Sequence, residues 1–482
     1  MSIPEALAVK PIASVDTMEI DTNILNPVVR TETFMRFVLM KKGILDPGSC
    51  IALSLNCGSA DGVMPIATGI HALIKQAVLR IGSKVVAVTD KYPEYATMRR
   101  QHQTQEEKTR KDMVRSGTMD VICPERDETG AGIGGEYSLR NVVKTGTTVL
   151  EAPEQFKLTT TGSTNNQYYI KLSQLFPAMR NVSLPLYLIN EPCSIEITFN
   201  KQASGQNGTI VTFSSDVAAG SDIASVNTAD TVFLADYLTY TDDRMQRLAG
   251  MVMSQDGLVI PYLDVITTNT SFSAVPQPAA TASTERQEIH DLGLSGMKVQ
   301  SILAHYHDKA GSEDTANPLG VYGSKAYTRP VRYNIRVNDK QLYPIDIESE
   351  TQKAHQLSQV FGTDINIGSG QYSFNPIIVN KTTDVRNYPA GANHYFNNAG
   401  LLNVLGAGHL LLRKLEGNSH YMGADFTIDG GVGQGVVCGQ TPIRVINNVV
   451  HQNTDFSGRD VTYFSIVERQ MQIKAGNVTV SA

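Results

Sequence analysis

The sequence predicts an all-β protein made of two sandwich or barrel domains. The chain has 482 residues, which exceeds the size at which one hydrophobic core stops growing, so two domains are expected. Charged residues make up only 18% of the chain, while Asn, Gln, Ser, Thr and Gly recur throughout. This balance suits strands and loops better than surface helices.

Short windows in which apolar residues recur at every second position predict the strands. Apolar and polar side chains alternate there, as half-buried antiparallel strands require. Such windows occur at 51–56, 195–200, 333–337, 426–428 and 471–473. Turn signals separate them, namely Asp46-Pro47-Gly48, Asn207-Gly208, Asp256-Gly257, Asn338-Asp339 and Asp429-Gly430-Gly431. These turns favour hairpins and tight reversals, and the spacing is typical of sandwiches or barrels.

Three segments have helical character. Thr241 offers a cap, Asp242 and Asp243 supply first-turn acids, and the helix should stop at 256–257. Ser349 and Gln352 fit a capping box for a second helix that Gly362 closes. The third segment, 93–115, is highly charged and has little apolar face, so we expect an exposed excursion.

The first helix lies near the middle of the chain, where a connection between two equal halves belongs. We therefore predict a first domain over 1–243 and a second over 244–482, with the joint near 241–257. The stretch 272–284 is rich in Pro, Ala, Ser and Thr, which predicts an irregular surface loop. The segments 79–84 and 335–340 are loosely alike, although this likeness is too short to indicate a repeat by itself.

Charge argues against direct nucleic-acid binding. The formal net charge is -6, and no block of Lys and Arg stands at either end. No apolar run approaches the length that spans a bilayer, and the start lacks the pattern of a signal peptide. We expect a soluble protein without a transmembrane segment.

The sequence predicts no catalytic, cofactor-binding or metal-binding residue. There is no phosphate-binding loop, and the glycine clusters at 130–135 and 430–435 fit flexible loops better than a dinucleotide site. His305 and His307 could begin a metal site, but no further ligands are evident, so a polar strand edge is favoured. The paired acids at 106–107 and 242–243 fit a solvated face and a helix start. Five cysteines lack close spacing and are expected to be buried free thiols, namely Cys50, Cys57, Cys123, Cys193 and Cys438.

Several stretches carry a family resemblance in chain order, namely 36–55, 74–82, 92–115, 169–177, 184–186, 195–197, 240–244, 258–260 and 333–344. They resemble the double jelly-roll major capsid proteins of double-stranded DNA viruses. The likeness is to those of virophages and polinton-like viruses, and more distantly to those of nucleocytoplasmic large DNA viruses. The run Tyr169-Ile170-Lys171-Leu172-Ser173-Gln174-Leu175-Phe176-Pro177 is the most family-like piece.

This resemblance implies two tandem antiparallel eight-stranded jelly rolls, with a few short helices in loops and at the joint. It also implies a structural role: pseudo-hexagonal homotrimers that tile an icosahedral shell in the virion, with penton or vertex proteins and minor capsid proteins as further partners. Long loops at 93–115, 117–165, 272–290 and 363–400 would form towers or trimer-locking exchanges. The resemblance brings no catalytic residue.

Two other readings share the same strands. A carbohydrate-binding or fibre-type attachment protein should carry a cluster of aromatic residues or an acidic calcium loop, and neither is evident. A β-sandwich hydrolase would need converging carboxylates or a nucleophile with its base.

Overall fold

A computed structural model describes the following residues of the chain: 18–56, 62–63, 68–101, 113–116, 157–158, 167–180, 182–200, 211–212, 225–272, 284–308, 330, 332–361, 421–426, 435–439, 443–451 and 459–481. Within them, strands dominate and helices are few. The glycine clusters and most of the expected tower loops lie outside these residues.

The first half of the chain forms two main antiparallel sheets. Its strands are β1 (Glu19–Leu25), β2 (Val29–Arg30), β3 (Phe34–Val38), β4 (Ile44–Leu45), β5 (Cys50–Asn56), β6 (Gly62–Val63), β7 (Ile74–Ile81), β8 (Lys84–Asp90), β9 (Lys157–Leu158), β10 (Gln167–Lys171), β11 (Cys193–Phe199), β12 (Val211–Thr212), β13 (Ser225–Val226) and β14 (Val232–Thr239). One sheet has the order β1-β14-β5-β10 and the other β2-β3-β11-β7-β8, while β12-β6-β9 form a small third sheet.

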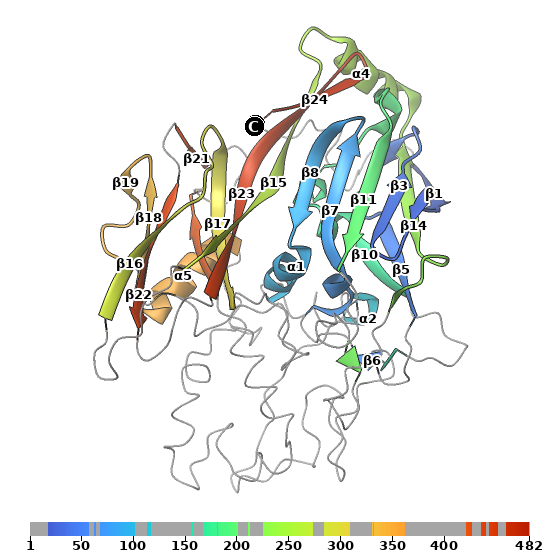
Figure 1. The fold of residues 1–482 in the computed structure, drawn as a ribbon. Helices are drawn as coiled ribbons and strands as arrows, with labels where there is room; N and C mark the ends of the chain where they lie inside the picture. The colour runs from blue at the N-terminus through green and yellow to red at the C-terminus, as the bar shows by residue number, and fades with distance from the viewer. Residues whose placement is uncertain are drawn as a thin grey trace, which may run out of the picture.

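The second half repeats this plan. Its strands are β15 (Leu258–Ser271), β16 (Thr284–Asp291), β17 (Lys298–Asp308), β18 (Arg332–Val337), β19 (Lys340–Gln341), β20 (Tyr421–Asp425), β21 (Val436–Val437), β22 (Arg444–His451), β23 (Arg459–Lys474) and β24 (Asn477–Ser481). The sheet orders are β15-β23-β17-β20 and β16-β22-β18-β19. Figure 1 shows the two sets of strands side by side, with their long axes roughly parallel.

Short helices join and close these sheets. They are η1 (Gly69–Leu73), α1 (Tyr92–Gln101), α2 (Met113–Ser116), α3 (Leu172–Leu175), η5 (Pro177–Met179), η6 (Leu186–Leu188), α4 (Asp242–Met253) and α5 (Glu350–Phe361). Every ladder among the described strands stays within β1–β14 or within β15–β24, and α4 lies between the two sets. The exact domain boundary at 243/244 stays a prediction.

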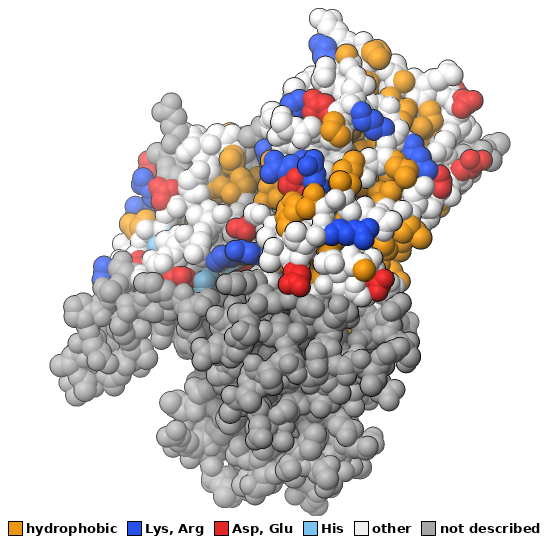
Figure 2. Space-filling model, turned by 45° about the vertical axis from the view of Figure 1, so that its right-hand side comes forward, with side chains coloured by type: hydrophobic (Ala, Val, Ile, Leu, Met, Phe, Trp, Pro, Cys, Tyr) orange, Lys and Arg blue, Asp and Glu red, His pale blue; other side chains and the backbone are white. Residues whose placement is uncertain are grey.

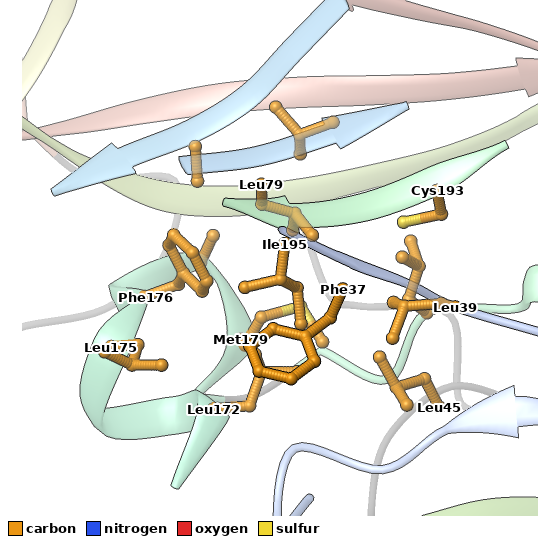
Figure 3. Close-up of a cluster of buried hydrophobic side chains, with 14 of the residues drawn as sticks. Phe37, Leu39, Leu45, Leu79, Leu172, Leu175, Phe176, Met179, Cys193 and Ile195 are labelled. Atoms are coloured by element: carbon orange, nitrogen blue, oxygen red, sulfur yellow. The ribbon is translucent and has the colours of Figure 1, made fainter. Parts of the chain in front are cut away.

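The core of the first half lies between its two sheets. Ile195 on β11 is directly opposite Phe37 on β3 and Leu79 on β7, and all three side chains are fully buried. In Figure 3 these residues face Leu172 and Met179, which come from α3 and η5. Period-two alternation along the strands therefore produces one continuous apolar layer, as expected for a sandwich.

The predicted local structure is confirmed at two helices and one turn. The α5 capping box forms: the Gln352 amide donates to Ser349 Oγ (3.2 Å), and the Ser349 amide donates to Gln352 Oε1 (3.1 Å). Helix α4 begins at Asp242, although the Thr241 side chain makes no capping hydrogen bond. The turn at Asn338 and Asp339 joins β18 to β19 with φ of 50° and 62°, the left-handed values of a two-residue hairpin.

Three expectations about exposure and regular structure were wrong. Strand β5 is not half-buried, because Ile51 and Leu53 on one face and Ala52 and Ser54 on the other are all 2% exposed or less. Helix α1, at the start of the supposed exposed excursion 93–115, is largely buried, with Tyr95, Thr97 and Met98 all 1% exposed or less. The expected loop at 272–290 contains strand β16 from residue 284 onward.

Candidate assembly surfaces

The contact between the two halves is the largest feature that links distant parts of the chain. Helix α1, from the first half, places Tyr95 and Met98 against an apolar face of the second half. The ring of Tyr95 lies 5.6 Å from that of Phe464 on β23, and Leu303 on β17 belongs to the same buried cluster. Tyr95 and Met98 of α1 therefore join the two halves.

Strands β8 and β15 continue this contact alongside α1. The Tyr262 hydroxyl on β15 donates to the carbonyl of Val86 on β8 at 2.7 Å. Burial raises the pKa of Asp264 on β15, and the hydrogen bond from Arg469 opposes this rise. The backbone amide of Val88 on β8 also donates to the Asp264 carboxylate. The two edge strands are thus tied through side chains and backbone, although they belong to different sheets.

A polar cluster closes one end of this contact. Lys91 stands between β8 and α1, with a left-handed φ of 48°. Its Nζ donates to Asn269 Oδ1 (2.9 Å) and to Thr462 Oγ1 (2.8 Å), which belong to β15 and β23. Thr462 Oγ1 also lies 2.9 Å from His307 Nε2. An unusual backbone conformation for a lysine thus directs a cation of the first half into the second.

The other end of the contact is held by the β7–β8 hairpin and a loop of the first half. Lys84 Nζ donates to the carbonyl of Val478 on β24 and to Glu191 Oε1. The Asn190 amide donates to the carbonyl of Gly476 (2.9 Å), which lies in the turn between β23 and β24. The halves are therefore joined along the whole length of their shared face.

An apolar surface lies at the free edge of the first half. Of twelve large hydrophobic side chains that are exposed among the described residues, seven fall between residues 18 and 40. They are Met18, Ile20, Ile24, Val28, Val29, Val38 and Met40. We call these seven residues the N-terminal apolar edge. Figure 2 shows apolar side chains interleaved with Lys and Arg on the face that this view brings forward.

The second half exposes fewer apolar side chains, and two of them lie on or beside the sheet β16-β22-β18-β19. Ile289 on β16 is 52% exposed, and Ile345, in the segment between β19 and α5, is 75% exposed. Strand β19 itself is exposed at both residues. In Figure 1 these elements lie at the opposite end of the molecule from β1.

The histidine pair does not form a strand edge, which corrects the expectation. Strand β17 lies inside its sheet, between β23 and β20, and His305 and His307 are both buried with ring centroids 5.7 Å apart. No group of three His, Cys, Asp or Glu residues in the described part of the chain is placed to hold a metal ion. His307 instead serves the contact between the halves through Thr462.

The cysteines within the described residues are free thiols. Cys193 and Cys438 are buried and Cys50 is partly buried, whereas Cys57 and Cys123 lie outside the described residues. Burial raises the pKa of Cys193 to about 12, which keeps its thiol protonated and unreactive. The acids Asp242 and Asp243 stand in the first turn of α4, as expected for a helix start. Among the described helices, none is long and apolar enough to cross a membrane.

Comparisons with known proteins agree with this architecture. Residues 38–241 match a family model described as Major capsid protein N-terminus. No curated protein matches the sequence significantly. Among solved structures, the Sputnik virophage is similar over 100% of this chain and 92% of the other, with a TM-score of 0.56 and 12% identity.

Two further structures have the same fold. The PBCV-1 virus capsid is similar over 98% of both chains, with a TM-score of 0.54 and 10% identity. The Faustovirus major capsid protein is similar over 96% of this chain and 92% of its own, with a TM-score of 0.51 and 8% identity. Residues 38–241 therefore match the Major capsid protein N-terminus family, and the whole chain shares the double jelly-roll fold of these solved structures.

Proposed function

We propose that this protein is the main building block of an icosahedral viral shell, and that three copies form a pseudo-hexagonal capsomer. The observation that carries the proposal is the family match over 38–241 within a chain whose full length has the double jelly-roll fold. The protein acts as a structural subunit and not as an enzyme.

The contact between the halves supports this role mechanically. A shell subunit must transmit forces without bending, and the buried α1 face and the ties of Tyr262, Lys91 and Lys84 hold the two sandwiches together. Each copy then presents two similar lobes in a constant arrangement. Three copies supply six lobes, which approximate a hexagon and can tile a surface.

The partners follow from the same role. The protein binds itself first, then neighbouring capsomers, and at the vertices it meets penton and minor capsid proteins. Its net charge of -6 provides little attraction for phosphate backbones, so the packaged genome is neutralised by other, basic components. We expect only weak DNA binding at physiological salt; tight binding that disappears with added salt would contradict this part of the proposal.

The trimer is tested by the mass of the purified full chain. The chain has a mass of 52.4 kDa, and three times 52.4 kDa is 157.2 kDa. Light scattering after size exclusion should give a species of about 157 kDa, and negative-stain microscopy should show three-fold particles with a hexagonal outline. A chain that remains monomeric at every concentration and salt tested would overturn the proposal.

A further inference from the structure

We propose that β1 of one copy docks on the β18–β19 hairpin and on the segment 342–349 of a second copy. This contact would repeat, between subunits, the contact that β15 makes with β8 inside each subunit. The inference rests on the proposed capsomer and identifies which two surfaces meet in it.

The first argument is the strand-by-strand repetition of the two halves. The sheets β1-β14-β5-β10 and β15-β23-β17-β20 have the same order, so β1 corresponds to β15. The sheets β3-β11-β7-β8 and β16-β22-β18-β19 also correspond, so β8 matches β19. Strand β15 contacts β8 inside the chain. The corresponding strands β1 and β19 are therefore the two edges that have no such contact within the described part of the subunit.

The hairpins make this correspondence specific at the residue level. Ile81 pairs with Lys84 across the β7–β8 turn, and Val337 pairs with Lys340 across the β18–β19 turn. The similar segments 79–84 and 335–340 therefore occupy the same position in the two halves. Lys84 binds the Val478 carbonyl of the other half, whereas Lys340 is exposed at the far end of the molecule.

The second argument is the difference in exposure between the corresponding edge strands. On β15, Ile260 is fully buried and Val265 is 4% exposed, because the first half covers this strand. On β1, Ile20 is 59% exposed and Ile24 is 65% exposed. Strand β1 is also the edge of its sheet and pairs only with β14 among the described strands. An edge strand with exposed apolar side chains favours coverage by another chain.

The opposite surface has matching character. Ile345 is 75% exposed beside β19 and supplies an apolar contact. Arg336 and Lys340 are exposed cations on the hairpin, beside the exposed acids Asp339 and Glu348. Strand β1 carries the exposed acids Glu19 and Asp21, and Asp21 binds Lys42 of its own subunit. The match of apolar side chains therefore carries this contact, whereas a contact between two copies of β1 would bring like charges together.

The positions of the two surfaces also favour a closed ring. Strand β1 and the β18–β19 hairpin lie at opposite ends of the molecule (Figure 1). Two different surfaces at opposite ends produce a head-to-tail contact, which closes into a ring when the rotation per copy divides a full turn. A ring of three copies would then contain three contacts within chains and three between chains, in alternation and all of the same kind.

The first test changes each surface separately in the full chain. Ile24→Asp on β1 and Ile345→Asp beside β19 should each weaken trimer formation by about tenfold or more, because a buried charge opposes an apolar contact. Met253→Asp is the matched control, since Met253 is 75% exposed on α4, away from both surfaces. Circular dichroism melts should coincide with the wild type, which separates lost assembly from lost folding.

The second test mixes the two variants. A head-to-tail contact has one intact surface on each variant, so Ile24→Asp and Ile345→Asp chains should associate one to one but not close a ring. Two times 52.4 kDa is 104.8 kDa, which mass photometry distinguishes from the trimer. If both variants trimerise like the wild type, this contact is wrong although the capsomer stands. If the wild type itself never trimerises, the proposed function fails first.

Discussion

The interiors of the two halves differ although their strand orders correspond. Between the sheets of the first half, the residues around Phe37 and Ile195 are apolar and fully buried (Figure 3). Between the sheets of the second half, apolar side chains such as Val299 and Ile335 are also packed together, but His290, Asn447 and Tyr463 add a hydrogen-bonded cluster. The same plan of strands therefore accommodates a buried polar cluster within a packed apolar core.

The geometry of the polar cluster is tight. The Tyr463 hydroxyl lies 2.8 Å from His290 Nδ1 and accepts from Asn447 Nδ2 at 3.0 Å. All three residues are 3% exposed or less, and the ring of Phe272 lies 5.0 Å from that of His290. Buried polar groups are costly when a partner is removed, so this cluster should be sensitive to the loss of a single hydrogen-bonding atom.

The largest effect should come from the packed core. Phe37→Ala removes a fully buried ring, and comparable truncations cost about 3–5 kcal/mol of unfolding free energy. Val38→Ala, one residue along the same strand, is the control because Val38 is 37% exposed and faces outward. Denaturant unfolding followed by circular dichroism measures both. Equal losses for the two variants would contradict the assigned faces of β3.

Removing the Tyr463 hydroxyl from the polar cluster should lower the free energy of unfolding. Tyr463→Phe keeps the ring but deprives His290 and Asn447 of their hydroxyl partner, at an expected cost of about 1–3 kcal/mol. Tyr237→Phe in the first half is the counterpart, since this side chain is also buried but its hydroxyl accepts only from the Met40 amide among its hydrogen bonds within the described residues. A loss at Tyr237 as large as that at Tyr463 would remove the proposed difference between the cores.

The tie between the halves should have a smaller effect. Tyr262→Phe deletes the hydrogen bond to the Val86 carbonyl and should cost about 1 kcal/mol. Calorimetry of the full chain would show whether the halves also begin to unfold separately. Tyr169→Phe is suited as control, because its hydroxyl only reaches Gln167 at 3.3 Å on the same strand. No difference between the two variants would argue against a rigid contact at Tyr262.

The smallest effect concerns pH. Burial lowers the pKa of His290 in the folded protein, against the opposing pull of Glu288, which lies 3.8 Å away. The unfolded chain therefore binds this proton more readily, and stability should decline as pH falls below about 6.5. His290→Asn should flatten the change in denaturation midpoint between pH 7.5 and 5.5. An equally steep change in the variant would assign the effect to other groups.

Local patterns predicted much of the fold. Alternation identified β5, β11 and β18, the turn residues identified the β18–β19 hairpin, and the capping residues identified α4 and α5. Each of these signals depends on neighbours within a few residues of the chain. The family resemblance added the jelly-roll arrangement, which no local pattern contains.

The errors concern contacts between residues far apart in the chain. Helix α1 was expected to be exposed because the segment 93–115 as a whole is highly charged, yet Tyr95 and Met98 meet strands more than 150 residues away. The position of His305 inside its sheet depends on pairing with β20 and β23, and that of His307 on pairing with β23. Likewise, the N-terminal apolar edge becomes visible only once β1 is known to be an edge strand.

The connector α4 has a consequence for the speed of assembly. Because one chain carries both sandwiches, the contact between β15 and β8 forms within a molecule, at the high effective concentration that a short tether provides. Joining six separate sandwiches into a ring would take five encounters in solution, whereas joining three tethered pairs takes two. Three of the five losses of translational freedom therefore occur during folding, before any subunit meets another.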